Sequence, residues 1–165
     1  MERMTYFMTC ETLQLTLENT PNLCDWIQTF GLDANRVKDN LSNDGTEDGP
    51  GLRFYGVRVS GEESGRYDIP AIAAAAFNKD EHKEFAVVTF ALYVRPETRR
   101  MGFGRDLILA LEQAAKDFGS EGLLLSLDET NSPDKDVAKA FVTACGYSYK
   151  GLLEGYEFYA KQDLL

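Results

Sequence analysis

Histidine and cysteine are scarce in this chain. His82 is the only histidine. A histidine-based zinc site or a Ser-His-Asp triad would have to use it, and the charged residues around it indicate an exposed turn instead. The three cysteines form no CxxC pair and no disulfide pattern, which is typical of a protein from a reducing cytoplasm; they are Cys10, Cys24 and Cys145. We therefore expect neither a metal site nor a disulfide framework.

Positive charge is also in short supply. The chain has 17 Lys and Arg against 27 Asp and Glu, for a net charge of −10. This balance argues against general nucleic-acid binding and against attraction to anionic membranes. No apolar run approaches the roughly 20 residues of a membrane span, and the first residues lack the charged start and apolar stretch of a signal peptide. We expect a cytoplasmic protein.

The hydrophobic pattern predicts a single α+β domain over residues 1–165. Its length suits one core of ordinary size. Alternating or continuous apolar runs predict strands at 13–17, 52–59, 67–77, 84–94, 123–127, 147–153 and 156–160. Helical spacing predicts helices at 20–30, 33–41 and 106–118, and another that opens at Asn131 and stops at Gly146. Short polar connections indicate antiparallel hairpins, whereas the helix at 106–118 implies a parallel pairing of 84–94 with 123–127.

A glycine turn between an apolar strand and an amphipathic helix is the most informative segment. It reads Arg99-Arg100-Met101-Gly102-Phe103-Gly104. A helix N-terminus has free backbone N–H groups and a partial positive charge, and it suits a phosphate. Four of the nine arginines fall within the eleven residues 95–105. This arrangement favours an anion site over the alternative, a surface helix start with solvated arginines.

Two familiar phosphate motifs do not match this turn. The Walker pattern is absent, and the dinucleotide fingerprint fails at its third glycine, where Leu107 stands. Arg-x-x-Gly-x-Gly after a strand that ends Leu92-Tyr93-Val94 resembles instead the acyl-CoA motif of the GCN5-related N-acetyltransferase (GNAT) superfamily. The order of the predicted elements also matches that fold over about residues 11–160. The resemblance is specific over 92–106 and, more loosely, over 123–159.

The resemblance implies how acetyl-CoA or coenzyme A would bind. Backbone amides from Met101 to Arg105 would hold the pyrophosphate, and the exposed backbone of the preceding strand would pair with the pantetheine arm. An asparagine usually opens the last helix in this family; Lys135 holds that place, and Asn131 is a candidate substitute. The implied cofactor-binding residues are Leu92, Tyr93, Val94, Arg99, Arg100, Met101, Gly102, Phe103, Gly104, Arg105 and Asn131.

The catalytic positions depart from the family pattern. The place of the usual glutamate base is Val88, and the place of the usual tyrosine acid is Val142. Glu84 and Tyr147 are our leading candidates for the general base and the general acid. Other candidate bases are Asp44, Glu47 and Asp48; other candidate acids are Tyr93, Tyr149 and Tyr156. Cys145 is better read as a small buried residue than as a nucleophile.

Two functions follow from the resemblance. One is an N-acyltransferase that moves an acetyl group from acetyl-CoA to a primary amine, on a small molecule or a protein, by direct attack in a ternary complex. The alternative is a weakly active or inactive member that binds acyl-CoA and acts by binding another protein or a metabolite. The acidic loop at 42–51 is either a lid that attracts a cationic amine or an ordinary solvated loop. Many relatives are dimers, so a homodimer is one assembly that the resemblance suggests.

Overall fold

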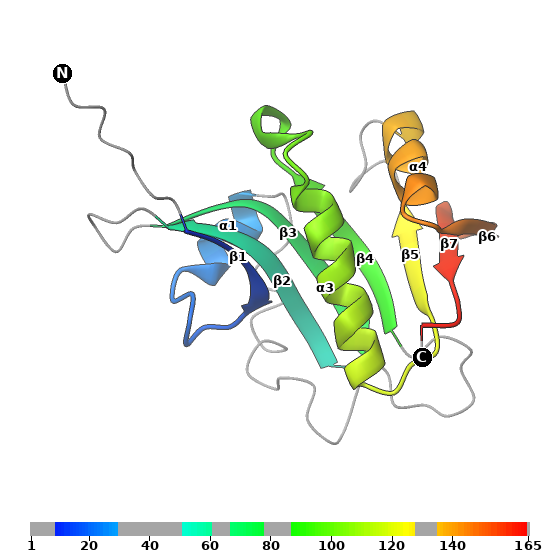
Figure 1. Ribbon diagram of the computed structural model, residues 1–165, viewed down its shortest axis with the longest axis horizontal. Coiled ribbons are helices and arrows are strands. Elements are labelled where there is room, and N and C mark those ends of the chain that lie inside the picture. Colours follow the sequence, from blue (N-terminus) through cyan, green and yellow to red (C-terminus); the bar gives the residue numbers. More distant parts are fainter. Residues whose placement is uncertain (1–8, 30–50, 61–66, 78–86, 128–134, 165) are drawn as a thin grey trace.

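Seven strands form one mixed sheet in the computed structural model, which describes residues 9–29, 51–60, 67–77, 87–127 and 135–164 (Figure 1). The strand order is β1-β2-β3-β4-β5-β7-β6. The strands are β1 (Thr9–Leu15), β2 (Gly51–Ser60), β3 (Tyr67–Phe77), β4 (Val87–Val94), β5 (Leu123–Leu127), β6 (Ser148–Leu153) and β7 (Tyr156–Lys161). The helices are α1 (Leu23–Thr29), the short 3₁₀ turn η1 (Pro96–Thr98), α3 (Phe103–Asp117) and α4 (Lys135–Ala144).

The pairing pattern confirms the predicted α+β class. Neighbouring strands are antiparallel except β4 and β5, which are parallel and are joined through α3. A parallel pair needs such a crossover, because the second strand must start at the same end as the first. The helix predicted at 106–118 therefore fixes this part of the topology.

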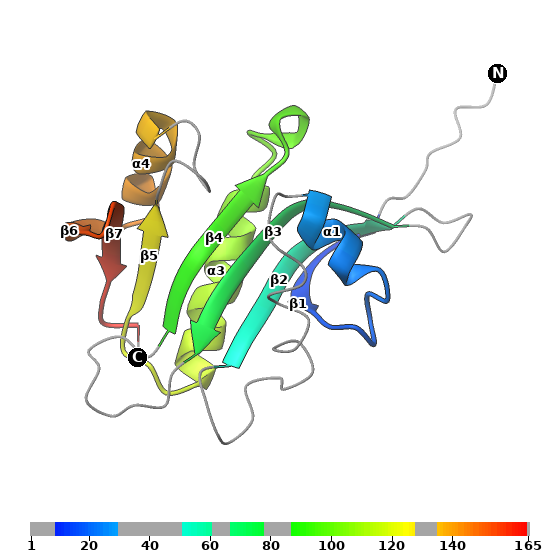
Figure 2. The ribbon, with the colours of Figure 1, turned by 180° about the vertical axis from the view of Figure 1, so that it is seen from behind.

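Two hydrophobic cores lie on opposite faces of the sheet. Helix α3 covers one face, and α1 covers the other (Figures 1 and 2). Side chains alternate between faces along a strand, and β3 serves both cores: Ala73 and Ala75 lie in the α3 core, whereas Ile72 and Ala74 lie in the α1 core. Helix α3 buries the stripe that its spacing predicted, namely Leu107, Ile108, Leu111 and Ala115.

Strands β4 and β5 pair along only part of their length. The register runs from Val87 opposite Leu123 to Thr89 opposite Leu125, and β4 continues to Val94. On its other edge β4 contains a bulge, because Ala74 pairs with residue 91 and Ala75 pairs with residue 89. A bulge bends a strand and increases its twist. Figure 1 shows the backbones of the two strands moving apart beyond their paired segment, where no pairing of residues 92–94 with β5 is seen among the described residues. We call the region in which these two backbones diverge the wedge.

Local hydrogen bonds move two predicted boundaries. The first strand ends at Leu15, because Asn19 closes a turn: its Oδ1 accepts from the Thr16 amide at 2.9 Å, and its side-chain amide donates to the Gln14 carbonyl at 2.9 Å. Leu17, predicted in the strand, is 43% exposed. Helix α1 starts at Leu23, three residues after the predicted start, and Thr20 donates its hydroxyl to Oδ1 of Asn19.

Other expectations lie outside the described residues. These are the helix at 33–41, most of the acidic loop at 42–51 and the opening of the last predicted helix at 131–134.

Candidate functional site

The N-terminus of α3 lies at the mouth of the wedge between β4 and β5. Gly102 is its N-cap, with a φ of 83° and no side-chain capping bond. The first helical hydrogen bond runs from the Asp106 amide to the Gly102 carbonyl at 3.0 Å. The amides of residues 103–105 therefore have no acceptor within the helix. Aligned free amides and the positive end of the helix dipole together can hold an anion.

The two glycines of the turn serve different purposes. A Cβ on Gly102 would meet nothing within 4 Å, so this position needs glycine for its left-handed φ. A Cβ on Gly104 would lie 3.0 Å from Cζ of Phe141 and 3.3 Å from Cγ2 of Val94. The structure adds a packing role for Gly104, which lets α3 lie against α4 and β4.

The four arginines near the turn are not equivalent. Arg95 is ion-paired to Asp68 and, at 3.1 Å, to Glu97. Nε of Arg99 donates to the Val94 carbonyl at 3.4 Å. Arg100 and Arg105 are exposed and form no ion pair with any residue in the described part of the chain. The charge that remains for a ligand is thus carried mainly by these two residues and by Arg99.

Backbone geometry also singles out Arg100. Its φ is 69°, in the left-handed region that side chains rarely adopt. Together with Gly102, this gives the turn two left-handed residues just before α3. Such strain persists only where the surrounding structure fixes it, and it gathers at ligand sites.

The remaining residues implied in cofactor binding line β4 and the turn. Leu92 and Val94 pack partly against the α3 core, whereas Tyr93 packs against the α1 core. Met101 is 63% exposed, and Phe103 is half-buried against the α3 core. Asn131 lies outside the described residues. The structure thus brings residues 92–94 and 99–105 to one end of the wedge.

The structure shows the positions of only some of the catalytic candidates. Glu84 and the acidic residues of the 42–51 loop lie outside them. Val88 sits in the middle of the sheet, opposite Ala76 on β3 and Leu124 on β5. Val142, at the usual acid position, is 1% exposed in the α3 core. Neither valine carries a group that could transfer a proton.

Tyr147 is held in a buried polar network. It is 2% exposed, and its hydroxyl donates to Oε1 of Glu112 at 3.0 Å. Nζ of Lys161 donates to the same oxygen at 2.9 Å and to the Cys145 carbonyl at 3.2 Å. Burial, with the adjacent Glu112 carboxylate, raises the pKa of Tyr147 far above its ordinary value. These contacts tie α3 to β7 and favour a structural role for this tyrosine.

Sequence reasoning missed Glu112 and Lys161. Glu112 is four residues after Ile108 and three before Ala115, so it falls on the buried stripe of α3. An acidic residue on an apolar stripe was a usable signal, since a buried charge needs a partner. The strand that supplies the partner, β7, is more than forty residues away, and spacing alone does not identify it.

The other polar candidates have ordinary surroundings. Tyr149 is 56% exposed and packs edge-on against Tyr159, with ring centroids 5.6 Å apart, and Tyr156 is 39% exposed. Burial raises the pKa of the half-buried Cys145 thiol, so the thiolate is disfavoured. Among the described residues no cluster of three metal-ligating side chains occurs, and no described helix is long and apolar enough to cross a membrane.

Comparison with known proteins places this chain in a family. The family model described as "Acetyltransferase (GNAT) family" matches residues 20–147. A search of curated proteins gives no match. Among solved structures, the PaiA N-acetyltransferase of Thermoplasma acidophilum in complex with coenzyme A has a TM-score of 0.64 and 16% identity, covering 93% of this chain and 99% of that one.

Two further structures show the same fold. Arabidopsis thaliana NAA60 in complex with acetyl-CoA has a TM-score of 0.65 and 12% identity, over 93% of this chain and 98% of that one. An acetyltransferase from Thermus thermophilus has a TM-score of 0.60 and 18% identity, over 96% of this chain and 99% of that one. From the family match and this shared fold, the chain belongs to the GNAT acetyltransferase family.

Proposed function

We propose that this protein, as one domain over residues 1–165, is an acyl-CoA-dependent N-acyltransferase of the cytoplasm. One observation carries the proposal: the free amides at the start of α3 lie at the open end of the β4–β5 wedge, in a chain of the GNAT family. Two proteins of this fold were solved with coenzyme A or acetyl-CoA bound. We expect acetyl-CoA to be the acyl donor.

The proposed cofactor contacts follow from charge and from unpaired backbone. The amides of residues 101–105 donate hydrogen bonds to the pyrophosphate oxygens, with Arg99, Arg100 and Arg105 supplying positive charge. The β4 edge at residues 92–94 is not paired with any described residue of β5. Its peptide groups, apart from the Val94 carbonyl that Arg99 contacts, are therefore available to the pantetheine amides. Asn131, four residues before α4 in the sequence, is a further proposed contact.

The proposed reaction is direct transfer. A neutral amine attacks the thioester carbonyl carbon, the C–S bond breaks, and the new amide forms. The amine loses a proton, and the leaving thiolate takes up a proton to give the free thiol. Backbone amides on β4 near residues 92–94 stabilise the oxyanion. Glu84 is the proposed base, acting directly or through water. Because Tyr147 is locked to Glu112, an exposed tyrosine such as Tyr156 is the better candidate for the acid.

The valines at positions 88 and 142 favour a second candidate function. A protein that keeps the cofactor site and lacks the usual base and acid could bind acyl-CoA and signal its presence to another molecule. Both functions predict coenzyme A binding. Only the first predicts amine-dependent release of free thiol from acetyl-CoA.

Thiol release with a panel of primary amines separates these functions. We expect Gly102→Asp to abolish the release, because it places a negative charge beside the pyrophosphate. Gly102→Asn is the matched control: its side chain has the same shape, tolerates a left-handed φ and is neutral. Activity that survives in Gly102→Asp would contradict the site. Coenzyme A binding without thiol release from any amine would favour the second function.

The acidic loop gives a prediction about the acceptor. If its carboxylates attract a cationic amine, the triple change Asp44→Asn, Glu47→Gln and Asp48→Asn should raise the KM for polyamines and leave the KM for acetyl-CoA unchanged. Steady-state kinetics at low and high salt measures this. An unchanged KM for the cationic amine would remove the loop from the acceptor site.

A further inference from the structure

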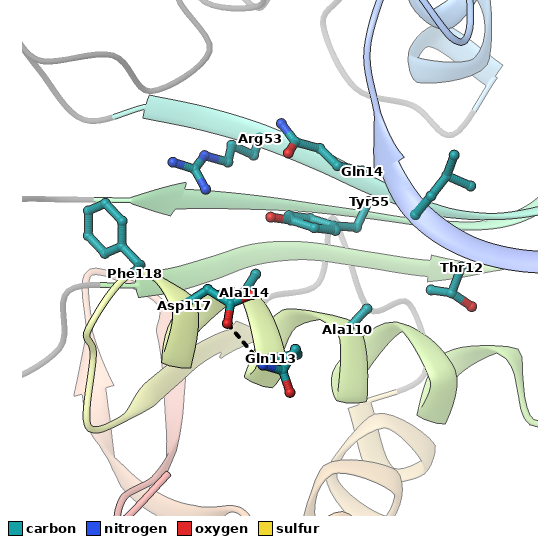
Figure 3. Close-up of a pocket in the computed structure, with 10 residues that line it drawn as sticks. Thr12, Gln14, Arg53, Tyr55, Ala110, Gln113, Ala114, Asp117 and Phe118 are labelled. Carbon is teal, nitrogen blue, oxygen red and sulfur yellow. Dashed lines mark hydrogen bonds between the residues drawn. The ribbon is translucent and has the colours of Figure 1, made fainter. Parts of the chain in front are cut away.

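A second hollow lies away from the cofactor wedge, between strands β1 and β2 and helix α3. Its volume is about 520 Å³, within the range of small-molecule sites. Ala110 and Ala114 of α3 line one side, and the Tyr55 ring of β2 lines the other (Figure 3). Its other lining residues are Thr12, Leu13, Gln14, Arg53, Gln113, Asp117 and Phe118. We call this hollow the β1–α3 groove.

Arg53 gives the β1–α3 groove its charge. Its guanidinium carbon lies 4.1 Å from the centre of the Phe77 ring and 5.7 Å from that of Phe118. The two rings meet edge to face at 5.3 Å, so they hold the guanidinium plane in place. Its Nε is buried without a hydrogen bond, and Arg53 forms no ion pair with any residue that the structure describes.

An oriented guanidinium with no ion-pair partner in the described part of the chain is unusual in a protein of net charge −10. Aromatic stacking fixes the plane of the guanidinium, and its buried Nε–H has no acceptor among the described residues. A carboxylate can match Nε–H and a neighbouring N–H of the guanidinium with two parallel hydrogen bonds. Figure 3 shows Arg53 and the Tyr55 hydroxyl directed toward the end of the groove where Phe118 lies. The anchoring point is therefore at that end.

The opposite wall limits the charge of the ligand. Asp117 lines the same end of the groove and accepts a hydrogen bond from Nε2 of Gln113 at 3.0 Å. Its carboxylate would repel a dianion such as phosphate more strongly than a single carboxylate. The Tyr55 ring and the two alanines supply apolar surface on opposite sides of the groove, which suits a flat apolar body.

We propose that the β1–α3 groove is a second ligand site, which takes a small planar monocarboxylate with its carboxylate on Arg53 and its apolar body between Tyr55 and α3. The site is separate from the wedge and does not depend on acyl transfer. Because α3 both lines the groove and carries the amides at its N-terminus, a bound ligand contacts the same helix as the cofactor.

A titration with phenylacetate tests this site. We expect saturable shifts of the backbone amide resonances of residues 110–118 in labelled protein, both without and with excess coenzyme A. Phenylacetamide, which has the same shape as phenylacetate but no charge, should produce no saturable shift. Arg53→Gln should weaken phenylacetate binding by about tenfold or more, the loss expected for a charge-assisted pair. Lys116→Gln removes the same charge from an exposed position on α3 outside the groove and should leave binding unchanged.

Each other outcome overturns the proposal. No saturable shift, equal binding by Arg53→Gln, or equal binding of phenylacetamide would remove the carboxylate site. Tighter binding of inorganic phosphate would contradict the monoanion assignment, and competition by coenzyme A would place the probe in the wedge. If Arg53→Gln does not fold, Gln113→Trp at an exposed helix position should block the groove, and unchanged phenylacetate binding by that variant would also overturn the proposal.

Discussion

Gly104 shows how one missing Cβ positions the start of α3. Gly104→Ala should lower the free energy of unfolding by about 1–3 kcal/mol, because the new methyl would press on the Phe141 ring and on Val94. Urea denaturation measures the change. Gly102→Ala has open space and meets only the cost of a left-handed φ, about 1–2 kcal/mol. A Gly104→Ala variant as stable as the parent would show that α3 and α4 do not approach this closely.

Because Tyr147 is buried, we expect the free energy of unfolding to decrease at alkaline pH. The pKa of Tyr147 is raised by burial and by Glu112, so the folded state keeps this proton where the unfolded chain, with a pKa near 10, loses it. The contribution of Tyr147 to the free energy of unfolding is fully present below about pH 10 and is lost as the pH rises further.

Tyr147→Phe tests that contribution. The variant should be about 1–3 kcal/mol less stable at pH 7, because the hydrogen bond to the Glu112 carboxylate is lost. Its stability should also decline less steeply than that of the parent above pH 10. Denaturant melts from pH 7 to 11 measure both quantities. Parallel curves for the two proteins would contradict the buried Tyr147–Glu112 contact.

At the scale of elements, Thr89 places a buried hydroxyl at the last pair between β4 and β5. Thr89 is 2% exposed, and its Oγ1 has no hydrogen-bond partner among the described residues. Thr89→Val replaces that hydroxyl with a methyl group and should raise the free energy of unfolding by about 1 kcal/mol.

The neighbouring serine is the matched control for Thr89. Ser126 donates its hydroxyl to the Thr89 carbonyl at 3.3 Å, across the same pair of strands. Ser126→Ala should therefore be destabilising by about 1 kcal/mol. Thermal and urea melts of both variants give the comparison. A destabilised Thr89→Val would mean that the hydroxyl has a partner.

The elements themselves were largely predictable from the sequence, and their ends were not. Apolar runs identified the strand at 67–77 with its bounds, and the strand at 123–127 with its parallel partner. Helix α3 begins at Phe103, three residues before the predicted start, because its N-cap is Gly102 in a left-handed conformation. The bulge in β4 depends on pairing with β3, so hydrophobic periodicity carries no sign of it.

At the scale of the molecule, the sheet consists of two parts that meet at three paired residues. Strands β1–β4 form one part, and β5–β7 form the other. The buried contacts of Glu112 with Lys161 and Tyr147 tie the second part to α3, which lies against the first. The turn motif predicts an anion site at the start of α3, and this stays a prediction. The tie, by contrast, brings together residues from α3 and β7 that local patterns do not connect.

Binding of coenzyme A at the start of α3 is the central claim, and thermal unfolding tests it most directly. The midpoint should rise with excess acetyl-CoA or coenzyme A, since a ligand that binds only the folded state adds about 2.7 kcal/mol at a hundredfold excess over its Kd. The rise should persist in Gly102→Asn and vanish in Gly102→Asp. No shift in the parent protein, or an equal shift in Gly102→Asp, would contradict the account.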